Sequence, residues 1–172
     1  MAVRPMAATR RRIIAAIIRY RGPMQRVAGS ARIPAPPDRV FAYLADLDNV
    51  AEWQGGVTAA RRTSDGPMDV GATAIVTRQL MGQRLEAPLT VNAFEPPRRL
   101  GIGSEVSGVR AQAVLDLAPA EEGRSTDLAF SMEIRGSGLT AFMEPMIAGA
   151  AKGDIESSLQ RVRDHFAVAE AG

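Results

Sequence analysis

Alternating apolar and polar positions predict β-strands through the middle of the chain. In one run, Leu85, Ala87 and Leu89 alternate with polar residues or proline, and a period of two is typical of a strand with one wet and one covered face. The pair Pro96-Pro97 interrupts the pattern because prolines cannot donate to a sheet ladder. We therefore expect an antiparallel sheet whose strands cover residues 25–33, 72–81, 84–94, 98–105, 109–117 and 126–134.

Helical spacing of apolar residues predicts two short helices after the first strand and one long helix at the end of the chain. Val40, Phe41 and Leu44 share one helical face, and Pro37 suits the first turn of that helix. A second short helix is expected to end near Trp53. Apolar residues then recur at helical spacing from 139 to 166, and a stripe of this length is expected to cover the apolar face of the sheet.

The front half of the long helix contains residues that disfavour a regular helix. Pro145 in a helix interior costs about 3 kcal/mol, and Gly149 and Gly153 cost about 1 kcal/mol each relative to alanine. We therefore expect the front half to be kinked or mobile and the rear half, from Asp154, to be firmly docked. If the front half is a gate, Pro145→Ala slows ligand exchange.

Composition limits the classes of site that the chain can hold. A chain of 172 residues suits one domain that buries roughly 70% of its unfolded surface. It has no cysteine and a single histidine, so disulfides and thiolate sites are excluded and a zinc site is disfavoured. We expect no metal and no cofactor, and a cytoplasmic location, with which the lack of cysteine is compatible.

The charge is unevenly distributed. Eight of the 21 basic residues and none of the 19 acidic ones lie in residues 1–37, which leaves the rest of the chain with a net charge of −6. Sequence-independent binding to nucleic acid needs many cationic phosphate contacts, so no nucleic-acid partner is expected.

The basic N-terminus, residues 1–23, allows several interpretations. Its apolar stretch at 13–18 is too short for a usual signal peptide or for a bilayer span. It is either a disordered extension or a short basic helix, which could make weak contact with an anionic membrane, and translation could also start at Met24. We expect residues 24–168 to form a single domain and residues 169–172 a tail.

Three stretches carry a resemblance to a known family. They are ARIPAPPDRVFAYLADLDNVAEWQGGV (31–57), GQRLEAPLTVNAFEPPRRL (82–100) and MEPMI (143–147) in the terminal helix. The chain resembles the START-like or SRPBCC superfamily, and in detail its polyketide cyclase/dehydrase and lipid-transport branch. The resemblance implies an α+β helix-grip fold, in which a curved antiparallel sheet wraps around the long C-terminal helix. It also implies a hydrophobic cavity between the two, with the short helices at its mouth.

The inward-facing residues suggest what would line such a cavity. Trp53 is expected either at the lip of the cavity or as a core residue that plugs the end of the domain. Small residues such as Ala111 and Ala113 either admit a close helix or leave space, and methionines either adapt to varied ligands or fill gaps in the core. The candidate cavity residues are Trp53, Leu85, Leu89, Ala111, Ala113, Phe130, Met132, Phe142, Met143 and Met146, with Pro145 and Gly149 as the gate.

No combination of residues marks a catalytic centre. His165 lies near the end of the last helix, far from the expected mouth, and is expected to be a surface or cap residue. Arg78 and Arg110 lie on strands, where solvated cross-strand pairs are the default, but an inward guanidinium could hold a carboxylate or enolate oxygen. The other charged strand residues considered are Arg84, Glu86, Glu133 and Arg135.

The sequence therefore favours non-catalytic binding of a small hydrophobic ligand of lipid, isoprenoid/quinone or polyketide-like chemistry. One alternative is an aromatic polyketide cyclase or dehydratase, which would need a buried acidic or basic side chain in the pocket with a partner able to shift its pKa. Another is a membrane-associated accessory protein that docks through residues 1–23. The ligand and the oligomeric state stay open.

Overall fold

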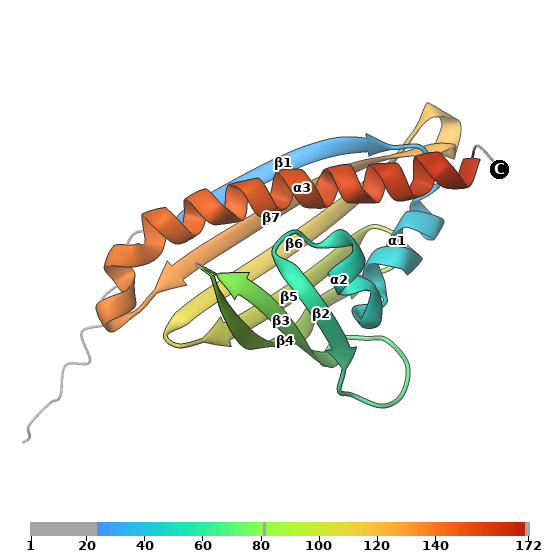
Figure 1. The fold of residues 1–172 in the computed structure, drawn as a ribbon. Coiled ribbons are helices and arrows are strands. Elements are labelled where there is room, and N and C mark those ends of the chain that lie inside the picture. Colours follow the sequence, from blue (N-terminus) through green and yellow to red (C-terminus); the bar gives the residue numbers. More distant parts are fainter. Residues whose placement is uncertain (1–23, 81, 171–172) are drawn as a thin grey trace, which may run out of the picture.

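A computed structural model describes residues 24–80 and 82–170; the predicted basic extension at residues 1–23 lies outside the described part. The expected α+β fold class is confirmed, because a curved antiparallel sheet holds a long C-terminal helix, α3, against one face (Figure 1). The elements are β1 (Gln25–Ile33), α1 (Pro37–Ala45), the 3-10 helix η1 (Leu47–Asn49), α2 (Val50–Trp53), β2 (Val57–Arg62), β3 (Thr73–Leu80), β4 (Gln83–Glu95), β5 (Arg99–Val106), β6 (Val109–Ala120), η2 (Glu121–Gly123), β7 (Ser125–Gly136), η3 (Gly138–Met143) and α3 (Glu144–Glu170).

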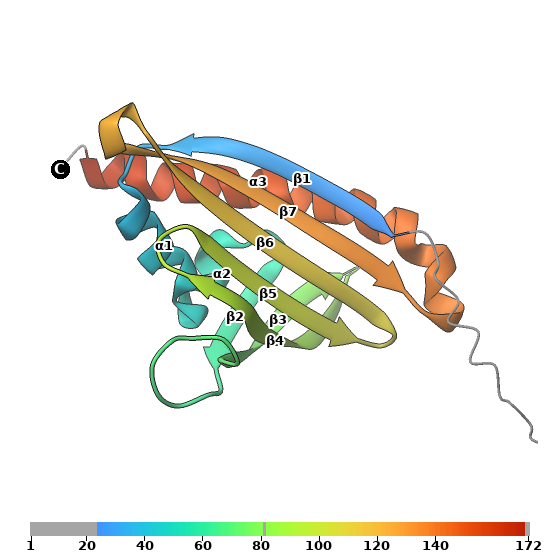
Figure 2. The same ribbon diagram turned by 180° about the vertical axis from the view of Figure 1, so that it is seen from behind.

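The seven strands follow the order β1-β7-β6-β5-β4-β3-β2. Each neighbouring pair is antiparallel, and the first strand pairs with the last. The first turns of α3 lie at the end of the sheet where β1 begins and β7 ends (Figure 1). The helices α1 and α2 lie near the last turns of α3. Seen from behind, the sheet has an outer face that none of the helices in the described residues covers (Figure 2).

The strands predicted from alternation are all present, with their ends shifted by a few residues. β2 was not predicted. It is an edge strand that pairs only with β3, and Val57 is its one buried residue. A strand with one buried residue shows no alternation, which explains why the pattern did not reveal it.

The long helix differs from the prediction at its start. Pro145 is the second residue of α3, and the helix then continues without a break to Glu170, which includes two residues expected to belong to the tail. The preceding segment is the 3-10 helix η3, whose capping box joins Ser137 and Thr140. The predicted interior kink is wrong, because a proline in the first helical turn replaces an N–H that has no helical partner there.

The core is densest at the end of the molecule that carries α1 and α2. Phe41 packs against Phe94 with ring centroids 5.4 Å apart, and Trp53 packs edge-on against Phe130 at 6.2 Å. At the opposite end, inward residues such as Val109 are only partly buried, so the two layers enclose space there. No helix within residues 24–80 and 82–170 combines the length and apolar character needed to cross a membrane.

Candidate ligand cavity

A cavity of about 310 Å³ lies between the front half of α3 and the inner face of β3 to β7. Alanines face it from both sides, Ala87 and Ala111 on the sheet and Ala150 and Ala151 on α3, so neither layer fills the space between them. The full lining is Arg78, Gln79, Leu85, Ala87, Ser104, Val106, Ser107, Val109, Ala111, Met132, Ile134, Thr140, Met143, Ile147, Ala150, Ala151 and Asp154.

The tip of the β5–β6 hairpin is tied to η3 at one end of this cavity. The carbonyl oxygen of Gly108 accepts hydrogen bonds from Ser137 N at 2.9 Å, Ser137 Oγ at 3.0 Å and Thr140 Oγ1 at 3.1 Å. Ser107 and Gly108 both have positive φ, 51° and 76°, which gives the hairpin its tight tip. Ser107 and Thr140 also line the cavity. Opening this end would therefore require η3 to separate from the hairpin tip.

Trp53 lies at the closed end of the space, not at its lip. A smaller void of about 20 Å³ shares Arg78, Ser104, Ala111 and Met132 with the main cavity and extends to the indole. Trp53 is only 1% exposed, and burial of an indole stabilises the fold by about 4–6 kcal/mol. Trp53 is therefore a buried core residue that also lines the smaller void. Its Nε1 is buried and has no hydrogen-bond partner among the described residues.

Gly55, two residues after the end of α2, allows the chain to approach α3 closely. A Cβ at Gly55 would lie 2.6 Å from the carbonyl oxygen of Asp154. The Gly55 N–H donates to Ser158 Oγ at 2.8 Å, and this hydroxyl donates to the Asp154 carbonyl at 2.6 Å. The glycine after Trp53 thus fixes the α2–β2 turn to the middle of α3.

An ion pair supplies the charged groups of the cavity wall. Arg78 Nη2 donates to Asp154 Oδ2 at 3.0 Å and to the carbonyl of Gly55 at 3.3 Å. The two charged side chains are 25% and 32% exposed and both line the cavity. Both bonds use Nη2, so Nε and Nη1 hold further N–H groups that no described residue engages. Arg78 therefore points inward, which is one of the two orientations that its strand position allowed; the other was a solvated cross-strand pair.

Asp154 was not among the predicted site residues. It follows Met143, Ile147 and Ala150 at helical spacing on the face of α3 that lines the cavity. That spacing was visible in the sequence, and it places Asp154 on this face. Similarly, Arg78 continues the alternation of the buried residues Ala74 and Val76 on β3.

The remaining predicted cavity residues divide into two groups. Leu85, Ala111, Met132 and Met143 line the main cavity. The smaller void takes the deeper residues Trp53, Leu89, Ala113 and Phe130, and again Ala111 and Met132.

Phe142 and Met146 are outside the cavity; they are 75% and 49% exposed. Successive residues of a helix point about 100° apart, so with Met143 and Ile147 facing the cavity, their neighbours point away from it. Pro145 and Gly149 are also exposed and do not line the cavity, so their role as a gate stays a prediction.

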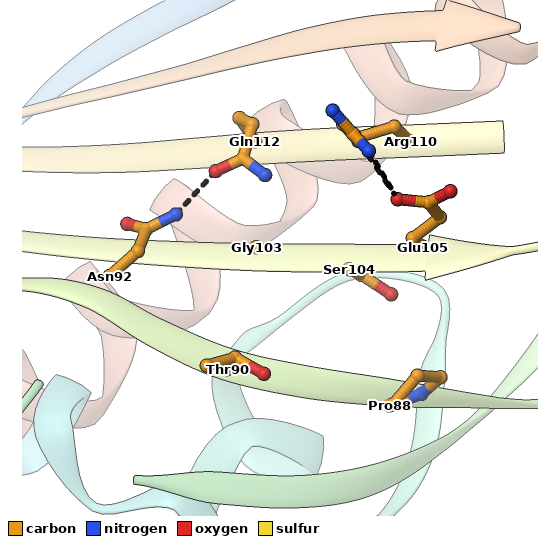
Figure 3. Close-up of a pocket in the computed structure, with 8 residues that line it drawn as sticks. All are labelled: Pro88, Thr90, Asn92, Gly103, Ser104, Glu105, Arg110 and Gln112. Carbon is orange, nitrogen blue, oxygen red and sulfur yellow. Dashed lines mark hydrogen bonds and ion pairs between the residues drawn. The ribbon is translucent and has the colours of Figure 1, made fainter. Parts of the chain in front are cut away.

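Arg110 does not contact the cavity because it points to the outer face of the sheet, opposite to Ala111. Its Nη2 pairs with Glu105 Oε2 at 2.7 Å, and nearby Asn92 donates to Gln112 (Figure 3). These side chains belong to an outer hollow of about 390 Å³, in which Arg110 pairs with Glu105 and Asn92 with Gln112. Its lining is Pro88, Thr90, Asn92, Gly103, Ser104, Glu105, Arg110 and Gln112 (Figure 3).

The titratable groups at the other end of the molecule lie far from the cavity. His165 is exposed, as expected, and stacks on Tyr43 with ring centroids 4.1 Å apart. Burial and the Glu52 carboxylate raise the pKa of Tyr43 to about 12. Within residues 24–80 and 82–170, no group of three His, Cys, Asp or Glu residues is arranged to hold a metal ion. An open groove of about 630 Å³ between α1 and the β4–β5 turn also lies outside the space between sheet and α3.

Comparison with known proteins identifies relatives over most of the chain. A family model described as polyketide cyclase / dehydrase and lipid transport matches residues 24–167. Two Mycobacterium tuberculosis proteins, named Toxin Rv0910 and Uncharacterized protein Rv1546, are each 25% identical to the chain. The alignments cover 84% and 83% of this chain and 99% of each relative.

Solved structures share the fold. The Zhui aromatase/cyclase from a Streptomyces species has a TM-score of 0.72 at 17% identity, covering 87% of this chain and 98% of that one. A START superfamily protein from Mycobacterium smegmatis has a TM-score of 0.70 at 10% identity, covering 84% of this chain and 98% of that one. At these identities the likeness concerns the fold alone.

Proposed function

Because the chain belongs to the polyketide cyclase / dehydrase and lipid transport family, we propose that it binds one small hydrophobic ligand between its sheet and α3 and leaves it chemically unchanged. The observation that carries the proposal is the cavity of about 310 Å³ with a mainly apolar lining. This volume is at the small end of the range of ligand pockets, about 300–1,000 Å³. It suits a ring system or a short acyl or isoprenoid chain.

The hydrogen-bond donors in the cavity wall favour a ligand that carries an oxygen atom at one end. The free N–H groups of Arg78 can donate to a carboxylate or carbonyl oxygen, and the hydroxyl of Ser104 lies in the part of the wall shared by both spaces. Deeper still, Trp53 Nε1 is a donor without a protein partner among the described residues, and an unpaired buried donor costs about 1–3 kcal/mol. We propose that burial of apolar area supplies the affinity and that these donors orient the ligand.

Fluorescence can measure binding because Trp53 is the only tryptophan of the chain. We expect a dansyl-labelled short-chain carboxylic acid, chosen to match the small cavity, to bind and to accept excitation energy from Trp53. Ala111→Phe adds a ring at a position that lines both spaces, and overfilling costs about 1–3 kcal/mol, so the affinity for the probe should fall about tenfold or more.

The matched control for this substitution is Ala118→Phe. Ala118 is on the same strand, β6, but is exposed to solvent, so the added ring should not change the affinity. Equal binding by the wild type, Ala111→Phe and Ala118→Phe proteins would show that the probe sits elsewhere, and the proposed function would then be rejected.

A second candidate function is cyclisation or dehydration of a polyketide-like substrate. The observation that favours it is the Arg78–Asp154 pair in the cavity wall, since an acidic side chain with a charged partner is what such chemistry requires. Asp154→Asn separates the two functions. A binding protein should keep its probe affinity within about threefold, because loss of a partly exposed ion pair costs about 0–1 kcal/mol, whereas an enzyme would lose turnover of a poly-ketone thioester.

A further inference from the structure

The solvent-facing side of η3 and of the first turns of α3 is apolar. Phe142, Pro145, Met146, Gly149 and Ala150 are all exposed, and their spacing of i, i+3, i+4, i+7 and i+8 places them on one side of a helix. We call these five residues the outer stripe. Such spacing normally marks the buried side of an amphipathic helix, but here the same helix already uses other residues to face the sheet.

No exposed charge interrupts the outer stripe. Between residues 138 and 151 the one charged side chain is Glu144, which is completely buried and accepts a hydrogen bond from Gly136 N at 2.5 Å. The next charge is Lys152. Single exposed apolar residues are ordinary on protein surfaces, but a continuous uncharged surface beside a cavity is typical of a contact site.

The outer stripe is continuous with the cavity. Ala150 belongs to the stripe and also lines the cavity, and Met143 and Ile147 line the cavity from positions next to Phe142 and Met146. A surface that covered the stripe would therefore also lie against the end of the cavity that η3 and the β5–β6 hairpin close.

Met24, the residue to which the basic segment 1–23 is joined, lies at the same end of the molecule. Residues 1–23 contain six arginines and no acidic residue, and they join the domain at Met24, whose Sδ lies 3.2 Å from Arg135 Nη2 at the end of β7. Met24 is itself 43% exposed. Each arginine near an anionic lipid surface contributes about 1 kcal/mol of attraction.

From this arrangement we propose that the protein docks on an anionic lipid membrane, with the outer stripe inserted at the interface and residues 1–23 held by the lipid headgroups. The end of the cavity at η3 then faces the bilayer. The proposal goes beyond ligand binding, since docking needs no ligand in the cavity. A small apolar surface next to a basic segment is what interfacial binding requires.

The size of the outer stripe argues against a second copy of the chain as its partner. A stable dimer interface takes about 20–30 residues from each side. The stripe has five, two of which are glycine and alanine. Two copies would also bring their arginine-rich N-termini together, which like-charge repulsion opposes.

Co-sedimentation of the ligand-free full chain with lipid vesicles tests the proposal. We expect binding to vesicles of phosphatidylglycerol and phosphatidylcholine and little binding to phosphatidylcholine alone. The double substitution Phe142→Gln and Met146→Gln should weaken binding about tenfold or more, because each side chain loses part of the burial that stabilises an apolar group in the interface.

The matched control is Val168→Gln. Val168 is as exposed as Phe142, 75%, but lies near the opposite end of α3, so its substitution should leave vesicle binding unchanged. In a third variant, Arg10→Gln, Arg11→Gln and Arg12→Gln together should weaken binding about tenfold or more, and added salt should weaken wild-type binding in the same direction.

Three results would overturn the proposal. The wild-type chain could bind neither kind of vesicle, or the Phe142/Met146 double variant could bind as well as the wild type, which would leave the outer stripe without a role. Alternatively, native mass spectrometry could show a dimer that the double variant abolishes, and the stripe would then be a protein interface. Dansyl-probe binding measured on the same variants separates these results from a failure of the ligand-binding proposal.

Discussion

Gly55 shows how one residue couples the two short helices to the cavity. A Cβ at this residue would meet the backbone of Asp154, so the turn after Trp53 lies directly against the helix that lines the cavity. A side chain at this position would separate the α2–β2 turn from α3. It would also disturb Arg78, which bridges the two by binding the Gly55 carbonyl and the Asp154 carboxylate.

We therefore expect Gly55→Ala to lower the free energy of unfolding by about 1–3 kcal/mol, the range for overpacking. Gly149→Ala is the control, because a Cβ there meets no atom within 4 Å, and alanine in a helix interior should raise stability by about 0.5–1 kcal/mol. Urea unfolding followed by circular dichroism measures both. Equal stability of the wild type and the Gly55→Ala variant would show that a Cβ at residue 55 fits beside the Asp154 backbone, contrary to this prediction.

Tyr43 predicts a loss of stability at alkaline pH. Burial, and then the Glu52 carboxylate, raise the pKa of Tyr43 to about 12, above the value of about 10 expected in the unfolded chain. Because the pKa of Tyr43 is higher in the folded state than in the unfolded chain, the protonated phenol contributes to the free energy of unfolding. This contribution is fully present below pH 10 and is lost as the pH rises from about 10 to about 12.

Absorbance titration can follow this ionisation in a Tyr20→Phe background, where Tyr43 is the one remaining tyrosine. Glu52→Gln should shift the Tyr43 pKa back toward its ordinary value, because the carboxylate no longer disfavours the phenolate. Titration of Tyr43 near pH 10 in the folded protein with Glu52 intact would contradict the structure of this cluster.

Among the elements, η3 lines one end of the cavity together with the tip of the β5–β6 hairpin. Its link to the β5–β6 hairpin consists of three hydrogen bonds to the carbonyl of Gly108, two of which come from the side chains of Ser137 and Thr140. If ligand exchange requires this end to open, the double substitution Ser137→Ala and Thr140→Val should speed release of the dansyl probe about tenfold or more, since each bond contributes about 0.5–1.5 kcal/mol.

Stopped-flow release of the probe measures this rate. Thr63→Val serves as the control, because it removes a comparable exposed hydroxyl bond, to Thr73 at 2.8 Å, at a distance from the cavity. Pro145→Ala tests the predicted gate in the same experiment. A slower release rate would support the gate, and an unchanged rate would reject it, because Pro145 lies in the first turn of α3.

Across the whole molecule, the sheet and the long helix could be predicted because both have clear periodicity. The alternating runs lie on one curved sheet, and the apolar stripe that includes Leu159, Val162 and Phe166 is buried against the core. β2 could not be predicted, because an edge strand with one buried residue carries no pattern. The boundary between η3 and α3 was also hidden, because residues 142–147 are apolar in nearly every direction.

The candidate site was only partly predictable for a related reason. Sequence alternation shows which face of a strand a residue occupies, and it correctly places Ala111 and Met132 inside. It does not show how far α3 stands from the sheet, which decides whether such residues line a void or pack together. The depth of Trp53 and the outward direction of Phe142 both depend on this three-dimensional arrangement.

Native mass spectrometry of the purified full chain tests most directly whether the space between the sheet and α3 holds a ligand. We expect the folded wild-type protein to carry a small apolar molecule, or to take up one equivalent of the dansyl-labelled short-chain acid. Unfolding should release the bound molecule, and the Ala111→Phe variant should bind the probe about tenfold or more weakly. A wild-type protein that shows only the mass of its bare chain, before and after incubation with the probe, would contradict this account.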